Sequence, residues 1–132
     1  MATTTLLILS AAIEFATGIA LIAAPDLVAH VLLGDGLSSS GVAVARLTGI
    51  ALLSLGLGCW PGRDHATAHA TWALFIYNLL AAIYLGYLRV AGGFAGYLLW
   101  PACALHAVMT LLLVRPAYER VSTAKAAPTS RL

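Results

Sequence analysis

The chain has 132 residues, of which 61% are hydrophobic and only 9% are charged, and its mean hydropathy is +0.95. This composition excludes an ordinary soluble domain, in which about a quarter of the residues carry a charge, and it indicates that the natural solvent is a lipid bilayer. The net charge of +2 gives no indication of a nucleic-acid partner.

Four apolar segments are long enough to cross the hydrocarbon core of a bilayer, which needs roughly 20 residues of helix. Each is expected to be helical, because an isolated segment in lipid must satisfy its own backbone hydrogen bonds and none alternates like a barrel strand. The sequence therefore predicts an all-α, integral membrane four-helix bundle over residues 1–116 and a polar, flexible cytoplasmic tail over 117–132. The predicted spans are about 5–24, 41–60, 68–89 and 95–114.

The connection after the first span, PDLVAHVLLGDGLSSSG, is too apolar for a plain loop. Its apolar residues recur so that they share one side of a short helix. Pro25 is expected to turn the chain into this helix, and Gly34 is expected to end it. We predict a short interfacial helix in the headgroup region.

Small residues recur every four positions on the first two spans. Close approach of two helix backbones is typical of this pattern, so we predict that these spans form a tight pair. The glycine-rich turn VAGGFAG makes the third and fourth spans neighbours. The recurring small residues are Ala12, Ala16, Ala20 and Ala24 on the first span and Gly41, Ala45 and Gly49 on the second.

The basic residues outside the spans are distributed unequally. The first connection has none, and the connection near residue 90 has only Arg89. By the positive-inside rule, we predict a multi-pass protein of a bacterial-type inner membrane with both termini in the cytoplasm. The five basic residues on the predicted cytoplasmic side are Arg63, Arg115, Arg120, Lys125 and Arg131.

An acidic residue interrupts the first span, in the stretch SAAIEFATG. Glu14 lies near the predicted midplane, where a charge costs about 2.5–3.5 kcal/mol. By helix rise, Glu14 lies roughly 15 Å below the outer end of its span and Arg46 roughly 8 Å below the outer end of the next. Because an arginine side chain can bridge that difference, we predict an ion pair between Glu14 and Arg46.

The third and fourth spans each carry a strongly polar residue at about the same depth. These are Asn78 and His106, so every span contributes one member to a central polar level. Polar groups that share a helix face should turn inward, away from lipid. The predicted ligand-binding residues are Glu14, Arg46, Asn78 and His106, together with Thr17 and Cys103 on the same faces.

Three interpretations of this polar level remain open. It can be a buried hydrogen-bond cluster that fixes the register of the helices. It can line a cavity for a small apolar or amphipathic molecule, such as a quinone or a lipid fragment, in an accessory subunit without its own cofactor. It can also be the site of a membrane isomerase or hydrolase in which Glu14 and His106 act as acid and base.

Two histidines at the start of the third span have the spacing of metal ligands. His65 and His69 stand at i and i+4 in DHATAHAT, which places two imidazoles on one helix face. Without a third ligand nearby, we expect an interfacial turn and no metal. Cys59 and Cys103 are predicted at different depths, so we expect no disulfide between them.

The second span resembles a known family. GVAVARLTGIALLSLGLGCW, with its buried Arg46 and its alternating leucines and glycines, is similar to the DoxX-like group of small four-helix bacterial membrane proteins. The resemblance implies an inner-membrane four-helix bundle, with some relatives linked to membrane redox or quinone-associated complexes. It carries over no catalytic residue, and this chain has no paired-cysteine motif for thiol redox chemistry. A homo-oligomer or a membrane protein partner is also consistent with the layout.

Overall fold

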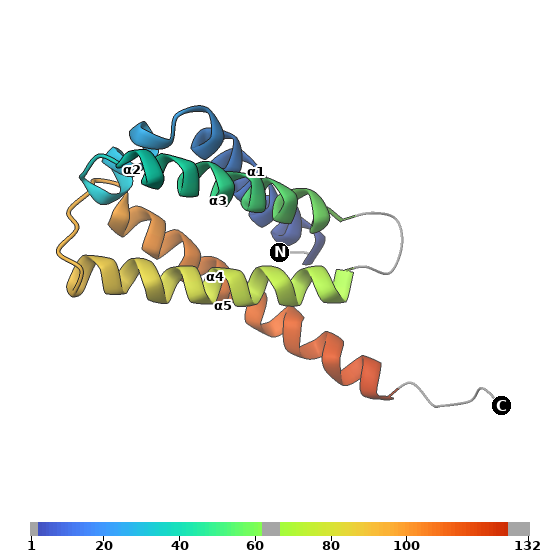
Figure 1. Ribbon diagram of the computed structural model, residues 1–132. Coiled ribbons are helices and arrows are strands. Elements are labelled where there is room, and N and C mark those ends of the chain that lie inside the picture. The colour runs from blue at the N-terminus through green and yellow to red at the C-terminus, as the bar shows by residue number, and fades with distance from the viewer. Residues whose placement is uncertain (1–2, 62–66, 127–132) are drawn as a thin grey trace.

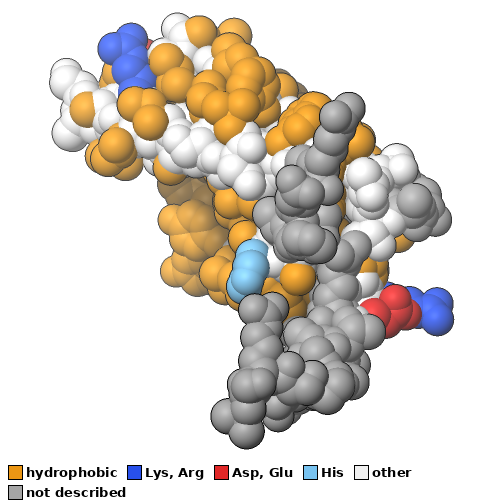
Figure 2. All heavy atoms as spheres, turned by 90° about the vertical axis from the view of Figure 1, so that its right-hand side faces the viewer, with side chains coloured by type: hydrophobic (Ala, Val, Ile, Leu, Met, Phe, Trp, Pro, Cys, Tyr) orange, Lys and Arg blue, Asp and Glu red, His pale blue; other side chains and the backbone are white. Residues whose placement is uncertain are grey.

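The computed structural model describes residues 3–61 and 67–126, and this part of the chain is all helical, without strands (Figure 1). Four helices are long and apolar enough to cross a membrane. Seen from the right-hand side of Figure 1, hydrophobic side chains cover much of the described surface (Figure 2). The predicted all-α membrane bundle is therefore confirmed. The helices are α1 (Thr3–Ala23), α2 (Pro25–Leu33), α3 (Ser39–Gly58), α4 (Thr67–Val90) and α5 (Leu99–Ala126).

The short helix after the first span is present as α2. It begins at Pro25, whose fixed φ suits the first helical position. It ends at Gly34, which has a φ of 84° and donates its backbone N–H to the His30 carbonyl at 2.9 Å. A left-handed glycine is a common end of a helix. Both predicted ends of the short helix are confirmed.

The first and second spans, α1 and α3, pack closely along their lengths, as predicted. The contact runs through glycines, since a Cβ added at Gly18 would lie 2.7 Å from the Gly49 carbonyl oxygen. A Cβ added at Gly56 would lie 2.7 Å from the Ala11 carbonyl oxygen. The predicted alanine row is not this contact, because its member Ala16 is exposed.

The third and fourth spans, α4 and α5, form the second close pair, and the turn between them contains Gly93 at a φ of +73°. α5 begins at Leu99, later than the predicted start at residue 95. The residues before it bind the end of α2 instead: Ala95 N–H donates to the Leu33 carbonyl at 3.2 Å, and Leu98 N–H to the Val31 carbonyl at 2.9 Å. These bonds satisfy carbonyls that α2 leaves free at its end.

α5 also runs farther than predicted, through Pro116 to Ala126, so residues 117–126 of the predicted tail are helical. A proline inside a helix cannot donate a backbone hydrogen bond, which destabilises the helix. Packing of the residues that follow can compensate for this loss. Here Ala117 is fully buried, and the Tyr118 ring lies 6.4 Å from the Trp72 ring between centroids. The predicted boundary at residue 116 therefore falls inside a packed helix.

The two helix pairs contact each other unequally along the bundle. At the end near residues 61 and 67, leucine, alanine and methionine side chains fill the space between the pairs. At the end covered by α2, the pairs diverge, and α3 has close contacts only with α1 and α2 among the described helices. Fully or almost fully buried side chains of the packed end include Leu7, Leu74, Met109 and Leu113.

Candidate functional site

A hydrogen-bonded chain of polar side chains joins α1, α4 and α5 in the middle of the bundle. Asn78, only 1% exposed, is its centre. Its amide nitrogen donates to the Leu74 carbonyl at 2.8 Å and to the Ser10 hydroxyl at 3.1 Å. Its amide oxygen lies 2.8 Å from Nδ1 of His106. Asn78 and His106, predicted to lie at the same depth, are therefore in direct contact.

Glu14 is inside the bundle, with a side chain that is 1% exposed. Its carboxyl group lies close to the Tyr77 hydroxyl of α4. One of its oxygens, Oε1, has no hydrogen-bond partner among the described residues. The acid thus faces the interior, as its cost in lipid requires, although Oε1 is left without a partner there.

The predicted ion pair between Glu14 and Arg46 is wrong. Arg46 is exposed, and within residues 3–61 and 67–126 the ion pair that the structure shows is between Arg115 and Glu119. The reason is the register of α3 on α1, which puts Gly56 beside Ala11 and Phe15, next to the level of Glu14. Arg46 lies about ten residues farther along α3, roughly 15 Å away, and a long basic side chain there can extend to the membrane surface.

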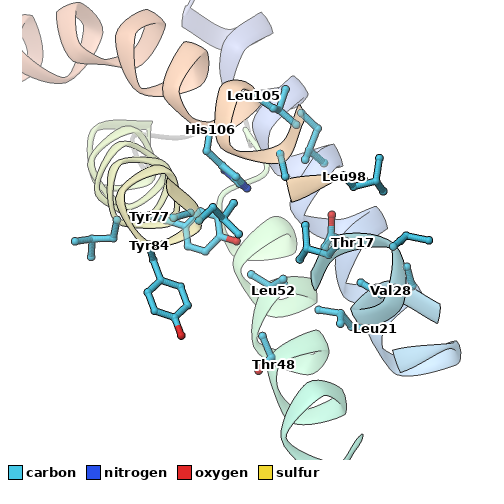
Figure 3. Close-up of a pocket in the computed structure, with 18 residues that line it drawn as sticks. Thr17, Leu21, Val28, Thr48, Leu52, Tyr77, Tyr84, Leu98, Leu105 and His106 are labelled. Carbon is cyan, nitrogen blue, oxygen red and sulfur yellow. The ribbon is translucent and has the colours of Figure 1, made fainter. Parts of the chain in front are cut away.

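A cavity of about 660 Å³ lies between the two helix pairs, with side chains from all five helices in its wall. This volume is typical of pockets for small molecules, which range over about 300–1,000 Å³. Val28, Val31 and Leu32 of α2 close one end of it. Near the middle of the bundle, Thr17, Tyr77 and His106 point toward a common space from three helices (Figure 3).

Apart from Thr48, whose hydroxyl is bonded to the Val44 carbonyl, and Tyr84, which is exposed, the other wall residues are aliphatic. Leu21, Leu52, Leu85 and Leu105 are examples from four helices (Figure 3 labels three of them). The polar groups inside the cavity are therefore concentrated at one end. Such a distribution suits a molecule with an apolar body and a small polar group.

The cavity opens sideways, between α3 and α4. Thr48 on α3 lines the cavity and is exposed. On the opposite side, Leu80 and Tyr84 of α4 line it and are 60% and 61% exposed. α3 and α4 do not pack closely on one another in the described part of the chain. The opening therefore faces the side of the bundle, where the acyl chains of a bilayer would be.

The predicted site residues divide into three groups. Thr17 and His106 line the cavity. Glu14 and Asn78 are not among the described wall residues, but each lies next to one that is: Glu14 is close to Tyr77, and Asn78 is hydrogen-bonded to His106.

The third group lies away from the cavity. Arg46 is on the outer surface, and the Cys103 thiol donates to the Ala82 carbonyl at 3.4 Å, between α4 and α5. Both Cys59 and Cys103 are free thiols.

The histidine pair predicted as a weak metal candidate is only partly described. His65 lies outside the described residues, and His69 is exposed. The described residues contain no cluster of three or more His, Cys, Asp or Glu side chains that could hold a metal. The described residues therefore do not support a metal site at this histidine pair.

Tyr77 is a wall residue at the polar end of the cavity that the sequence did not predict. Its ring packs edge-on against His106, with 5.6 Å between the ring centroids, and its hydroxyl lies close to Glu14. Its position in the sequence could have indicated this role. Tyr77 directly precedes Asn78 in the middle of a span, whereas tyrosines of membrane proteins are enriched at the membrane interfaces.

Comparisons with protein-family models, with curated proteins and with solved structures give no match. The resemblance to the DoxX-like group therefore stays a prediction from the sequence of the second span.

Proposed function

We propose that this chain is a multi-pass membrane protein that takes one small amphipathic molecule, quinone-like or lipid-like, from the bilayer into an intramembrane cavity. The observation that carries the proposal is the cavity of about 660 Å³ between the helix pairs, aliphatic over most of its wall and polar at one end. Loose packing alone would not explain why three polar side chains point into the same space.

The shape of the cavity supports a defined orientation for the bound molecule. Its polar group would lie beside Thr17 and His106, and its apolar body would run along Leu21 and Leu52 toward the opening. Polar groups that are few and specifically placed fix the orientation of a ligand, while the apolar wall supplies most of the contact.

The lateral opening supports access from the membrane and not from water. A molecule that partitions into acyl chains reaches Thr48, Leu80 and Tyr84 without crossing a polar surface. The predicted orientation, with both termini in the cytoplasm, rests on the basic residues alone, and the proposal does not depend on it.

Binding is better supported than catalysis by the predicted acid and base. A general acid or base must come within hydrogen-bonding reach of its substrate. His106 lines the cavity, but Glu14, which lies close to Tyr77, is not among the described wall residues. The two groups share no direct hydrogen bond in the described structure. The geometry thus supports a binding protein.

Photo-crosslinking with a dodecyl diazirine in proteoliposomes tests this proposal. Labelling of the wall residues Leu52 and Leu105 is expected to saturate and to be displaced by excess unlabelled dodecyl compound. Labelling of Leu111, which is 73% exposed on the outer surface of α5, should rise in proportion to the probe. Contact with bulk lipid has no saturable component, so the two positions separate a binding site from solvation.

A filled cavity provides the matched control. Ala81 lines the cavity, so Ala81→Trp should abolish the saturable labelling and leave that of Leu111 unchanged. Labelling at Leu52 that never saturates in the unmodified protein would show that the space is only a place where lipid tails pack.

A further inference from the structure

The orientation of the Asn78 amide is fixed by one of its partners. The Leu74 carbonyl can only accept a hydrogen bond, so the group 2.8 Å from it must be the amide nitrogen. The amide oxygen then points the other way, to Nδ1 of His106 at 2.8 Å. Asn78 therefore presents an acceptor to the histidine.

This orientation selects one tautomer of His106. An amide oxygen has no proton to donate, so Nδ1 of His106 must carry the proton in their hydrogen bond. In the neutral ring, which brings no charge into the apolar wall, Nε2 is then a hydrogen-bond acceptor. Nε2 has no protein partner in the described part of the chain, and the ring points into the cavity (Figure 3).

Thr17 supplies a second free group at the same end. Threonine hydroxyls within helices usually bond to a carbonyl of the preceding turn. The Thr48 hydroxyl donates to the Val44 carbonyl at 2.9 Å, and the Thr110 hydroxyl donates to the His106 carbonyl at 2.8 Å. The Thr17 hydroxyl has no such bond in the described structure, although it lines the cavity.

We infer that the polar group of the bound molecule is a hydroxyl, so that the ligand is an alcohol or a phenol and not the corresponding carbonyl compound. This inference rests on the proposed function and names the chemistry of the ligand. A hydroxyl donates to Nε2 of His106 and accepts from Thr17, which satisfies both groups. A carbonyl oxygen in the same place would face the lone pair of Nε2, and two acceptors cannot form a hydrogen bond.

Matched ligands of equal chain length test the inference. The melting temperature of the full chain in detergent is measured with increasing decanol, and with a methyl ketone and a methyl ether of similar chain length. All three compounds should affect the detergent micelle to a similar extent, so differences between them report binding. We expect decanol to bind roughly fivefold more tightly than the ketone, the ratio that one net hydrogen bond of about 1 kcal/mol gives. His106→Leu should remove this preference.

A threonine inside the cavity and one outside it provide the matched variants. Thr17→Val should weaken decanol binding a few-fold, because the free hydroxyl is lost. Thr110→Val should leave it unchanged, because that hydroxyl is already bonded to the His106 carbonyl and Thr110 is not among the described wall residues of the cavity. This pair decides the question even when His106→Leu does not fold. Equal effects of the two valine variants on decanol binding would overturn the inference.

The outcomes separate the inference from the proposed function. Decanol and the ketone binding equally well, in a cavity that Ala81→Trp blocks, would overturn the hydroxyl assignment and leave the binding function intact. Binding of neither compound would contradict both. The tautomer has an independent readout in the ¹⁵N spectrum of His106, recorded with the other three histidines replaced by glutamine: a protonated Nε2 would contradict the inference.

Discussion

The two halves of this bundle are made from the same four spans but are packed differently. In the half near residues 61 and 67, Leu7, Leu74 and Leu113 are fully buried against one another's helices. In the half covered by α2, leucines of the same helices, such as Leu21 and Leu85, line a cavity of about 660 Å³. The polar chain from Ser10 to His106 lies between the two halves.

The difference indicates that the hollow half is held open by specific bonds. Lipid offers no hydrophobic force to drive helices together, so helix packing in a bilayer depends on close contacts and polar bonds. Here the backbone bonds from Ala95 and Leu98 hold the α4–α5 turn on α2, while Asn78 joins the pairs at mid-bundle. Both ends of the cavity are therefore fixed.

The largest expected effect is on the packed half. Leu7→Ala should lower the free energy of unfolding by about 2 kcal/mol or more, because it leaves a void among buried side chains. Leu21→Ala, on the same helix but at the cavity, should cost about 1 kcal/mol or less, because fewer contacts are lost. Reversible unfolding in mixed micelles measures both. Equal losses would contradict the distinction between the halves.

The contact between α1 and α3 should be almost as sensitive as the packed half, although part of it lies beside the cavity. Gly18→Val places a side chain against the Gly49 carbonyl and the Leu53 backbone, and overpacking of this kind costs about 1–3 kcal/mol. Gly58→Val is the control, since a Cβ there meets nothing within 4 Å. A Gly18 variant as stable as the Gly58 variant would show that the helices are not in close contact.

The third effect concerns the hydrogen-bonded chain from Ser10 to His106, which lies between the two halves. Breaking it should lower the free energy of unfolding by about 1–3 kcal/mol. Asn78→Leu leaves Nδ1 of His106 and the Ser10 hydroxyl without their partner, and buried groups that lose a bond carry the full desolvation cost. Ser10→Ala should cost less, because Asn78 keeps its bonds to Leu74 and His106. Thermal melting in detergent measures the loss of stability in both variants. A larger loss for the Ser10 variant than for the Asn78 variant would contradict this prediction and show that the bond to α1 is the more important one.

The smallest expected effect comes from adding volume to the cavity. Ala20 lines it, so Ala20→Leu should change the free energy of unfolding by less than about 1 kcal/mol. Ala11 on the same helix is fully buried, and Ala11→Leu should be clearly destabilising. Thermal melting of this pair tests whether the volume is free space, and a strongly destabilised Ala20 variant would mean that it is not.

Much of the fold could be predicted from the sequence because lipid imposes simple rules. Span length, the ends of α2 at Pro25 and Gly34, and the pairing of α1 with α3 follow from hydropathy, turn chemistry and small residues. The burial of Glu14 and the meeting of Asn78 with His106 follow from the cost of polar groups in lipid.

The features that the sequence did not predict, such as the separation of Arg46 from Glu14, depend on helix register, which composition does not specify. A register set by Gly18, Gly49 and Gly56 puts Arg46 far from Glu14. Counting residues from predicted span ends could not find this shift, because α3 begins and crosses α1 according to its glycines. A cavity was predicted around the four polar residues, but its mostly aliphatic wall was not, because that wall depends on where α3 and α4 do not pack on one another.

Native mass spectrometry of the protein extracted with its own lipids tests the central claim most directly. We expect one small molecule to be retained per chain and to be released on activation, and Ala81→Trp should lose it while keeping the annular lipids that bind elsewhere. A variant with a filled cavity that retains the same molecule at the same occupancy, or an unmodified protein that retains only annular lipid, would contradict the claim that the hollow half is a binding site.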